Sequence, residues 1–264
     1  MRERARALLA PAPLCVVRAP AAALRPPAAV PLPQAAGKRS IQIDFGCWVA
    51  PTALFAASYA DQIFAVEPDP EAYREAWHNI ELNPHLSRKI VRRQLCISDK
   101  RGQLTLYGSK GDSMSSAFPD KNPAARYQYT SWNVECTTLD AFIAAENINP
   151  DEITLIKVDT EGHEAPIMWQ MRSWLKAHPN IVISLSIHAF LYPDVADPAT
   201  ALMHTQLRDV IMDYKTVIFT HGDPIHRDGF SVGGWCRLCS LLLTNADTPA
   251  GFASWKDAFQ GKKA

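Results

Sequence analysis

From residue 40 onward, short apolar runs rich in β-branched residues alternate with longer segments whose apolar residues recur at helical spacing. We expect strands or extended segments at residues 41–44, 62–67, 91–98, 103–107, 153–158, 180–188, 216–220 and 237–244. We expect helices at residues 51–60, 70–82, 139–146, 166–177 and 200–213. Strands that alternate with helices predict a doubly wound, parallel α/β sheet. The lack of a helical pattern between the last two strands predicts an antiparallel hairpin.

The segment at residues 108–132 is polar and contains Gly, Ser, Pro and Asn throughout, which predicts a long loop. Loops of this length in compact domains are often lids or binding segments. Asp112, Ser113, Ser115 and Ser116 offer partners to a substrate rich in hydroxyl groups. A solvated loop is the simpler interpretation, and we favour it.

The strand at residues 153–158 leads directly into a cluster of charged side chains, which are Asp159, Glu161, His163 and Glu164. In open α/β sheets, ligands bind in the crevice beyond the carboxyl ends of the strands, so acids at this position are placed to contact a ligand. The simpler alternative is that the acids cap the following helix. A cap needs one carboxylate and the cluster has three, so we predict a functional site at this strand end.

Composition divides the 264 residues into three segments. Residues 1–39 are dominated by Ala, Pro and Arg, contain Glu3 as their only acid, and are expected to be disordered. A targeting peptide and an overlong start are alternatives for this segment. Residues 40–246 form the expected folded domain, and residues 247–264 form a C-terminal tail. No segment is apolar over the length that a transmembrane helix requires, so we expect no membrane contact.

Charge and cysteine content narrow the classes of partner and compartment. Lys and Arg total 27 and Asp and Glu total 27, so neither nucleic acid nor a basic partner is indicated. The cysteines lie in apolar surroundings, which favours reduced thiols and a cytoplasmic enzyme over a disulfide framework. They are Cys15, Cys47, Cys96, Cys136, Cys236 and Cys239. The last two have CxxC spacing but no second Cys or His pair nearby, which disfavours a metal or redox role.

A second candidate ligand site lies in the N-terminal half of the predicted domain. The first strand ends in Asp44, and Gly46 opens the turn into the first helix, where a helix N-terminus favours a nucleotide-type ligand. About 20 residues further on, the second strand ends in Glu67, a position from which a carboxylate accepts hydrogen bonds from ribose hydroxyls. This spacing indicates a nucleotide-type site without specifying the cofactor.

Further motifs follow in a fixed order along the chain. After Asp44 and Gly46 come Glu-Pro-Asp-Pro at residues 67–70, Leu-Asp at residues 139–140 and Asp-Thr-Glu-Gly-His-Glu at residues 159–164. Over roughly residues 40–245, this order resembles the FkbM family of S-adenosylmethionine-dependent methyltransferases. The resemblance implies a class I methyltransferase fold, a Rossmann-like, seven-stranded and mostly parallel sheet with a C-terminal antiparallel hairpin. It also implies methyl transfer from S-adenosylmethionine, most often to a hydroxyl oxygen of a sugar or natural product.

The resemblance also implies a set of cofactor-binding residues. The expected set is Asp44 and Gly46 for the methionine part, Glu67 for the ribose, Ser98 or Asp99 for the adenine, and the neighbouring Cys47, Trp48 and Pro68. Two positions depart from the family's pattern. Ala50 stands where the family repeats a glycine, and Cys47 stands where the family often has alanine. The methyl group of Ala50 is expected either to be tolerated at the helix start or to crowd the cofactor.

Methyl transfer to an alcohol needs an aligned nucleophile and a group that accepts its proton. His188 ends a strand expected to lie beside the one that carries Asp159, and imidazole titrates near neutral pH, so we predict His188 as the base. A merely structural histidine at a strand end is the alternative. His163 ranks second, because neighbouring carboxylates would favour its charged form. In a further alternative, Asp159, Glu161 and either histidine hold a magnesium-like divalent ion that orients the hydroxyl and lowers its pKa.

We expect a small-molecule or glycan acceptor, although no pattern identifies the acceptor or the oligomeric state. Two other classes of protein compete with this hypothesis. A dinucleotide-dependent oxidoreductase shares the glycine turn and the ribose carboxylate, but the chain lacks G-x-G-x-x-G. A non-catalytic relative that has kept the fold is the other alternative, and Ala50 is the feature that favours it.

Overall fold

The computed structural model describes residues 38–108, 111, 113, 115–118, 130–191, 196–220, 225, 230, 232 and 239–245. Residues 1–37, the C-terminal tail from residue 246, Asp112 and Cys236 lie outside the described residues, so the predictions made for them stay predictions. The strands are β1 (Ile41–Phe45), β2 (Gln62–Val66), β3 (Ile90–Arg93), β4 (Cys96–Ile97), β5 (Gly102–Gly108), β6 (Thr130–Thr137), β7 (Ile153–Val158), β8 (Val182–Ile187), β9 (Thr216–Phe219) and β10 (Cys239–Thr244). The α-helices are α1 (Pro51–Ala56), α2 (Pro70–Glu81), α3 (Pro84–Ser87), α4 (Leu139–Ala145), α5 (Glu164–Ala177) and α6 (Pro198–Met212). Short 3-10 helices are η3 (Pro150–Glu152) and η4 (Ala189–Leu191).

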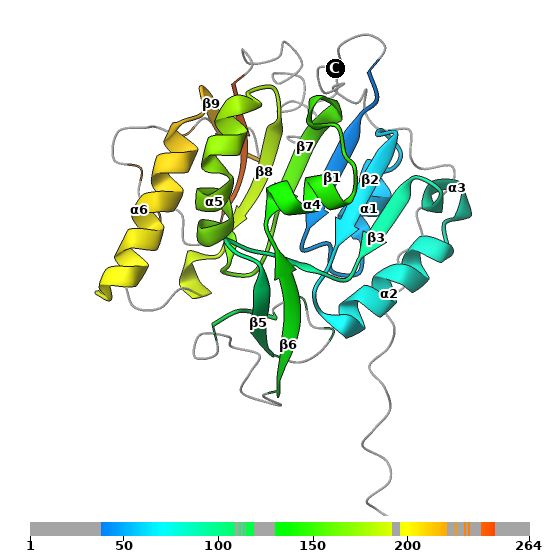
Figure 1. Cartoon of the computed structure of the whole chain (residues 1–264), viewed down its shortest axis with the longest axis horizontal. Coiled ribbons are helices and arrows are strands. Elements are labelled where there is room, and N and C mark those ends of the chain that lie inside the picture. Colours follow the sequence, from blue (N-terminus) through cyan, green and yellow to red (C-terminus); the bar gives the residue numbers. More distant parts are fainter. Residues whose placement is uncertain are drawn as a thin grey trace, which may run out of the picture.

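The main sheet has seven strands in the order β3-β2-β1-β7-β8-β10-β9 (Figure 1). All neighbours from β3 to β8 are parallel, whereas β10 runs antiparallel to both β8 and β9. This confirms the predicted parallel sheet and its C-terminal hairpin. Because β1, β2, β7 and β8 run in the same direction, their carboxyl ends meet at one edge of the sheet. The polar residues that follow these strands therefore gather at that edge.

A second sheet, which the hydrophobic pattern does not predict, contains three strands in the order β4-β6-β5. The strand expected at residues 91–98 is divided, because β3 ends at Arg93 and the next short strand, β4, pairs with β6 instead. The expected loop at residues 108–132 ends early, since β6 begins at Thr130 and pairs along its length with β5. Only Val134 and Cys136 of β6 are buried, so its apolar alternation is weak.

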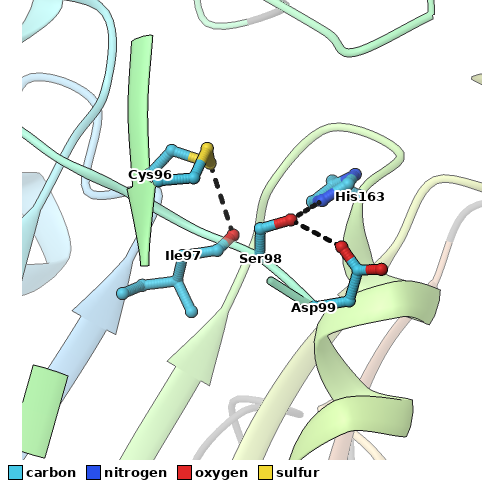
Figure 2. The surroundings of a disulfide bond; sticks show 6 residues. Cys96, Ile97, Ser98, Asp99 and His163 are labelled. Atoms are coloured by element: carbon cyan, nitrogen blue, oxygen red, sulfur yellow. Dashed lines mark hydrogen bonds between the residues drawn. A yellow bond between two sulfur atoms is a disulfide. The ribbon is translucent and has the colours of Figure 1, made fainter. Parts of the chain in front are cut away.

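The expectation of reduced cysteines is wrong for the small sheet. Cys96 and Cys136 are register partners on β4 and β6, their Cα atoms lie 4.3 Å apart, and their sulfur atoms form a disulfide (Figure 2). Cys239 is also disulfide-bonded, whereas Cys47 is a free and buried thiol. An apolar neighbourhood shows that a cysteine is buried, but it does not show whether the fold brings a second cysteine to it.

Two apolar clusters cover opposite faces of the main sheet. Phe64 and Val66 of β2 pack in the cluster that contains residues of α4, α5 and α6, whereas Ile63 and Ala65 pack with α1 and α2. Successive side chains of a strand point to opposite faces, so the main sheet has helices on both sides (Figure 1). Among the helices of the described part, none has the length and apolar character needed to cross a membrane.

Candidate active site

The turn after β1 is shaped by a glycine in the left-handed backbone region. Gly46 has a φ of 75°, and a Cβ atom at this position would lie 1.8 Å from the backbone oxygen of Asp159. The N–H groups of Gly46 and Cys47 both donate to the carbonyl of Val66, at 3.0 and 3.2 Å. The turn is therefore fixed between the ends of β2 and β7, and no side chain fits at position 46. Burial raises the pKa of the Cys47 thiol, which keeps it protonated.

Ala50 is also in the left-handed region, with φ 66° and ψ 30°. Its side chain is fully buried in the cluster that contains Ala53 and Leu54, and it does not line the strand-end cavity described below. The methyl group thus contacts the core and does not crowd the crevice. The departure from glycine instead costs backbone strain, about 1–2 kcal/mol for an L-residue in this conformation.

Glu67 follows β2 and is only 7% exposed. Its two carboxylate oxygens accept hydrogen bonds from the backbone N–H of Trp48 at 2.8 Å and of Asp69 at 2.9 Å. Burial raises the pKa of Glu67, and the two N–H bonds lower it. Burial is the larger effect, so the pKa rises to about 7. These bonds hold the carboxylate at the crevice, and each oxygen has a further lone pair that a ribose hydroxyl can use.

The loop after β5 packs against the same part of the molecule. Trp48 donates its indole N–H to the carbonyl of Gly111 at 3.1 Å. Asp69, which caps α2 as its N-cap residue, also accepts from the N–H of Gly111 and the hydroxyl of Ser115, at 3.1 and 3.0 Å. Ser116 accepts from a backbone N–H within the loop. The hydroxyls of Ser115 and Ser116, which were the less favoured candidates for substrate contact, therefore make contacts within the protein.

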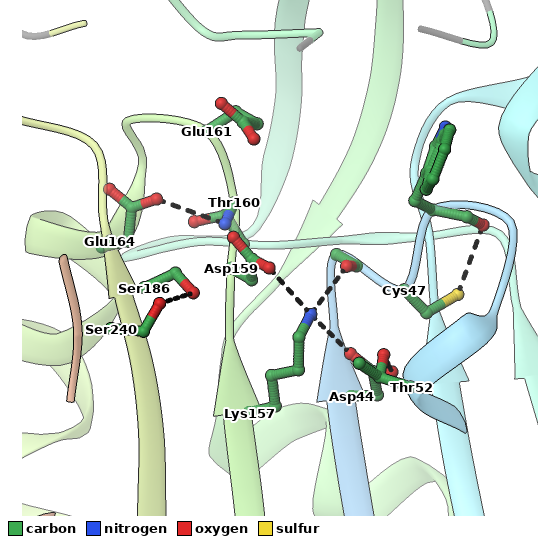
Figure 3. A network of polar contacts seen from close by, with 12 residues as sticks. Asp44, Cys47, Thr52, Lys157, Asp159, Thr160, Glu161, Glu164, Ser186 and Ser240 are labelled. Atoms are coloured by element: carbon green, nitrogen blue, oxygen red, sulfur yellow. Dashed lines mark hydrogen bonds and ion pairs between the residues drawn. The ribbon is translucent and has the colours of Figure 1, made fainter. Parts of the chain in front are cut away.

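A buried lysine joins Asp44 to the acids after β7 (Figure 3). Lys157 Nζ lies 2.9 Å from Asp44 Oδ1 and 3.2 Å from Asp159 Oδ2, and it donates to the carbonyl of Gly46 at 3.1 Å. Thr52 donates its hydroxyl to the other oxygen of Asp44. Burial alone would lower the pKa of Lys157, but the two carboxylates raise it above its ordinary value, so the amine stays charged. The sequence analysis missed Lys157, although a charged residue within a buried strand requires a partner.

His188, Asp159 and Glu161 come together as predicted, from the adjacent ends of β7 and β8. Nε2 of His188 lies 3.4 Å from Glu161 Oε1 and 3.7 Å from Asp159 Oδ1. On the other side of the ring, Nδ1 lies 2.9 Å from Glu164 Oε1. Because a carboxylate only accepts, His188 Nδ1 carries a hydrogen and Nε2 faces the other two acids.

Glu164 has a role that the sequence analysis did not assign to it. It is fully buried, and its Oε1 also accepts from the backbone N–H groups of Thr160 and Gly162, at 3.2 and 3.0 Å. The N-cap residue of α5 is His163, which makes no capping bond through its side chain. Glu164 thus fixes the turn before α5 and orients His188.

The environment of His188 bears on its predicted role as the base. Burial lowers the pKa of His188, but the hydrogen bond and charge of Glu164, with the charges of Glu161 and Asp159, outweigh burial and raise the pKa to about 9. At neutral pH the ring is therefore protonated on both nitrogens and lacks the lone pair that a base needs. Acting as a base at neutral pH would require additional positive charge in the site.

His163 lies beside Ser98 and Asp99, the two residues expected at the adenine (Figure 2). Its Nε2 lies 2.9 Å from the hydroxyl of Ser98, which in turn donates to Asp99 at 2.9 Å. The Ser98 hydroxyl has one hydrogen, which it donates to Asp99. It therefore accepts in its bond with His163, so Nε2 of His163 carries a hydrogen. Burial lowers the pKa of His163, against the charges of Asp99 and Glu164, which raise it. The expectation that neighbouring acids keep His163 charged is wrong, because burial dominates.

A small cavity lies between the end of the main sheet and the small sheet. Its walls include the apolar side chains of Phe45, Val66, Pro68, Ile97 and Leu106, together with Gly46, Thr160 and His163. Within the described part of the chain, the hydroxyl of Thr160 is buried and has no hydrogen-bond partner. Apolar walls suit an adenine ring, and an unsatisfied buried hydroxyl suits a polar ligand atom. The residue types that line the cavity are therefore those that suit part of a nucleoside cofactor.

Comparisons with known proteins indicate the family to which the chain is similar. A family model described as the methyltransferase FkbM domain matches residues 41–215. The structure of methyltransferase FkbM from Methylobacillus flagellatus KT is 13% identical, with a TM-score of 0.45, over 78% of this chain and 43% of that chain. The METTL16 methyltransferase domain is 12% identical, with a TM-score of 0.39, over 82% of this chain and 64% of that chain. The chain thus spans less than half the length of the FkbM structure. No curated protein matches it.

Proposed function

The chain belongs to the FkbM methyltransferase family, and we propose that it transfers a methyl group from S-adenosylmethionine to a hydroxyl oxygen of a sugar, glycan or natural product. Its seven-stranded sheet is that of the class I methyltransferases. The family match carries the activity, and the site described above supports the finer assignment of cofactor and acceptor chemistry.

The observation that carries the proposal is the network around Lys157. This amine contacts Asp44 beside the glycine turn at 2.9 Å and Asp159 of the acid cluster at 3.2 Å. One buried cation therefore holds the proposed cofactor side and the proposed acceptor side together. A methyl donor and its acceptor must be aligned within a single crevice, and this network provides a rigid floor for both.

The cofactor would be held by residues at the carboxyl ends of β1, β2 and β4 and in the turn after β7. We assign the ribose hydroxyls to Glu67, the adenine to the apolar cavity beside Ser98 and His163, and the methionine part to the turn at Gly46. The free hydroxyl of Thr160 lines the same cavity and is an additional candidate contact. Asp44 supports this side indirectly, because its oxygens already bind Lys157 and Thr52.

The acceptor would lie on the side of Asp159, Glu161 and His188. In the reaction, the acceptor oxygen forms a bond to the methyl carbon, the bond between carbon and sulfur breaks, and the hydroxyl proton leaves to a nearby base. A bound sulfonium supplies the electrophilic methyl group. The protein's task is to orient the hydroxyl and to take its proton, and among the described residues Asp159 and Glu161 offer carboxylates for this while the ring of His188 orients them.

Titration of the full chain with S-adenosylhomocysteine by calorimetry tests the cofactor assignment. We expect saturable binding, and we expect Glu67→Gln to weaken it by at least about 10-fold, since an amide cannot accept both backbone bonds and the ribose hydrogen bonds. Glu71→Gln is the matched control, because Glu71 lies four residues away on α2 and pairs with the exposed Arg74. If S-adenosylhomocysteine at millimolar concentration gives neither a heat of binding nor a thermal shift, the proposal is wrong.

A methyl donor labelled on the transferred carbon, incubated with a panel of glycosides and polyols, tests the acceptor assignment. The proposal predicts a labelled methyl ether, which mass spectrometry and NMR distinguish from an ester, an amine or a carbon-bound methyl group. Cofactor binding with transfer only to nitrogen, sulfur or carbon would refute O-methylation while leaving the methyltransferase activity in place.

A further inference from the structure

Three side chains from two neighbouring strand ends form a compact set of ligand atoms. Asp159 and Glu161 follow β7, His188 follows β8, and one oxygen or nitrogen atom from each lies within 4.8 Å of the others. The set is not a surface cluster of acids. His188 is 7% exposed, and its Nε2 is directed at the two carboxylates.

The spacing of these atoms suits a metal ion. Ligand atoms about 2.1 Å from a cation lie about 3.0 Å apart on an octahedron and about 3.4 Å apart on a tetrahedron. Nε2 of His188 lies 3.4 Å from Glu161 Oε1 and 3.7 Å from Asp159 Oδ1. The two distances from Nε2 exceed the octahedral value by about 0.4 and 0.7 Å, so a cation bound by all three side chains would draw them closer together.

A second, independent feature presents the histidine nitrogen to this position. Glu164 lies behind the ring, fully buried, and accepts the Nδ1 hydrogen at 2.9 Å. The backbone N–H groups of Thr160 and Gly162 hold the same oxygen. A carboxylate that binds the distal nitrogen of a histidine is the usual support of a metal-ligating histidine, because it fixes both the tautomer and the ring orientation.

The side chains around this position carry more negative charge than Lys157 neutralises, which favours a cation. Lys157 neutralises Asp159 through Oδ2, at 3.2 Å, and leaves Oδ1 facing His188. Glu161 and Glu164 add two further carboxylates on either side of the ring. A divalent cation facing Nε2 would balance the negative charge of these carboxylates.

We propose that Asp159, Glu161 and His188 bind a divalent cation of the magnesium or manganese class, with Glu164 as the residue that positions His188. The two carboxylate ligands suit such an ion, whereas the imidazole favours a transition metal such as manganese over magnesium, and three protein ligands leave coordination positions open. The existence of the site does not depend on the proposed function, but its catalytic consequence does: a cation here would lower the pKa of an acceptor hydroxyl. In this assignment His188 is a ligand and not the base.

The test measures Mn²⁺ binding to the full chain after a chelator has removed any bound metal. EPR of the free ion and calorimetry both report the binding. We expect one Mn²⁺ per chain. Glu161→Gln removes a ligand from a side chain that is 20% exposed, and should weaken binding by about 10-fold or more. Glu164→Gln should weaken binding by about 10- to 100-fold by misorienting the ring. Asp151→Asn, at the opposite end of β7 and 70% exposed, is the control and should change nothing.

Paramagnetic broadening provides a readout that a structural role would not give. Mn²⁺ should broaden the ring signals of His188, assigned through His188→Gln, before those of His85 or His204. Absence of saturable Mn²⁺ binding, or binding that Glu161→Gln leaves unchanged, would overturn the proposal, even if Glu164→Gln fails to fold. S-adenosylhomocysteine titrated in the presence of chelator separates the two proposals, since its binding tests the cofactor site alone.

Discussion

Replacing Lys157 by methionine keeps most of the side chain's length but removes the cation between Asp44 and Asp159. The Lys157 and Asp44 side chains are 15% and 7% exposed, so their ion pair is buried, whereas Asp159 is 31% exposed. Removing one partner of a buried pair costs about 3–5 kcal/mol, because the other charge remains buried and uncompensated. The pair with Asp159 is partly screened by solvent and adds little. We therefore expect Lys157→Met to lower the free energy of unfolding by about 3–5 kcal/mol.

Urea denaturation of the full chain measures this loss. Lys176→Met is the matched control, since Lys176 is 55% exposed, pairs with Asp213 at 3.1 Å, and should contribute less than about 1 kcal/mol. Adding Asp44→Asn to Lys157→Met should restore part of the stability, because the buried charge is then removed together with its partner. If Lys157→Met costs no more than Lys176→Met, the view of Lys157 as the buried link between the two sides of the site is wrong.

Three further predictions concern stability, each measured by urea denaturation. Ala50→Gly and Ala53→Gly each remove a fully buried methyl group, but of the two residues only Ala50 has a positive φ. Glycine relieves the backbone strain at position 50, so Ala53→Gly should lower the free energy of unfolding by about 1–2 kcal/mol more than Ala50→Gly. Equal losses of stability would contradict strain at Ala50. Between pH 4.5 and about 7 the folded chain keeps the Glu67 proton that the unfolded chain has lost, so stability should fall by up to about 3 kcal/mol as pH rises. Glu67→Gln should lack that component of the pH slope, and an unchanged slope would refute the raised pKa. Replacing both Cys96 and Cys136 by serine opens a crosslink over 40 residues and should cost about 4 kcal/mol, whereas no loss would argue against the disulfide.

The main sheet and the composition of the site follow from local patterns. Apolar runs and helical periodicity locate the parallel strands, and the rule that ligands bind beyond the strand ends places Asp159 and Glu67 at one edge. The proximity of His188 to Asp159 follows from strand order, because β8 pairs with β7. These features are predictable since each depends on a short segment and on a general rule of parallel sheets.

The features that sequence reasoning missed depend on partners that are distant in the chain. Cys96 and Cys136 are separated by 40 residues, and only the register of β4 with β6 joins them. For His163, the charge expected from its sequence neighbours was outweighed by burial, which no local pattern reports. The charge of Lys157 within a buried strand is visible in the sequence. Its partner Asp44 is not, because it lies on a different strand, at the directly paired register position.

The charge of the crevice connects the two proposals. Its carboxylates are Asp44, Glu67, Asp159, Glu161 and Glu164. A sulfonium loses its charge during methyl transfer, so fixed negative charge stabilises the bound donor more than the transition state and opposes the reaction. The acceptor oxygen meanwhile needs positive charge to lose its proton. Lys157 neutralises Oδ2 of Asp159 toward the donor, and a cation at Oδ1 would neutralise the same residue toward the acceptor. If the proposed cation binds at Oδ1, both cations share Asp159, so loss of either one would alter the field on both reacting partners and couple donor binding to acceptor activation through this single carboxylate.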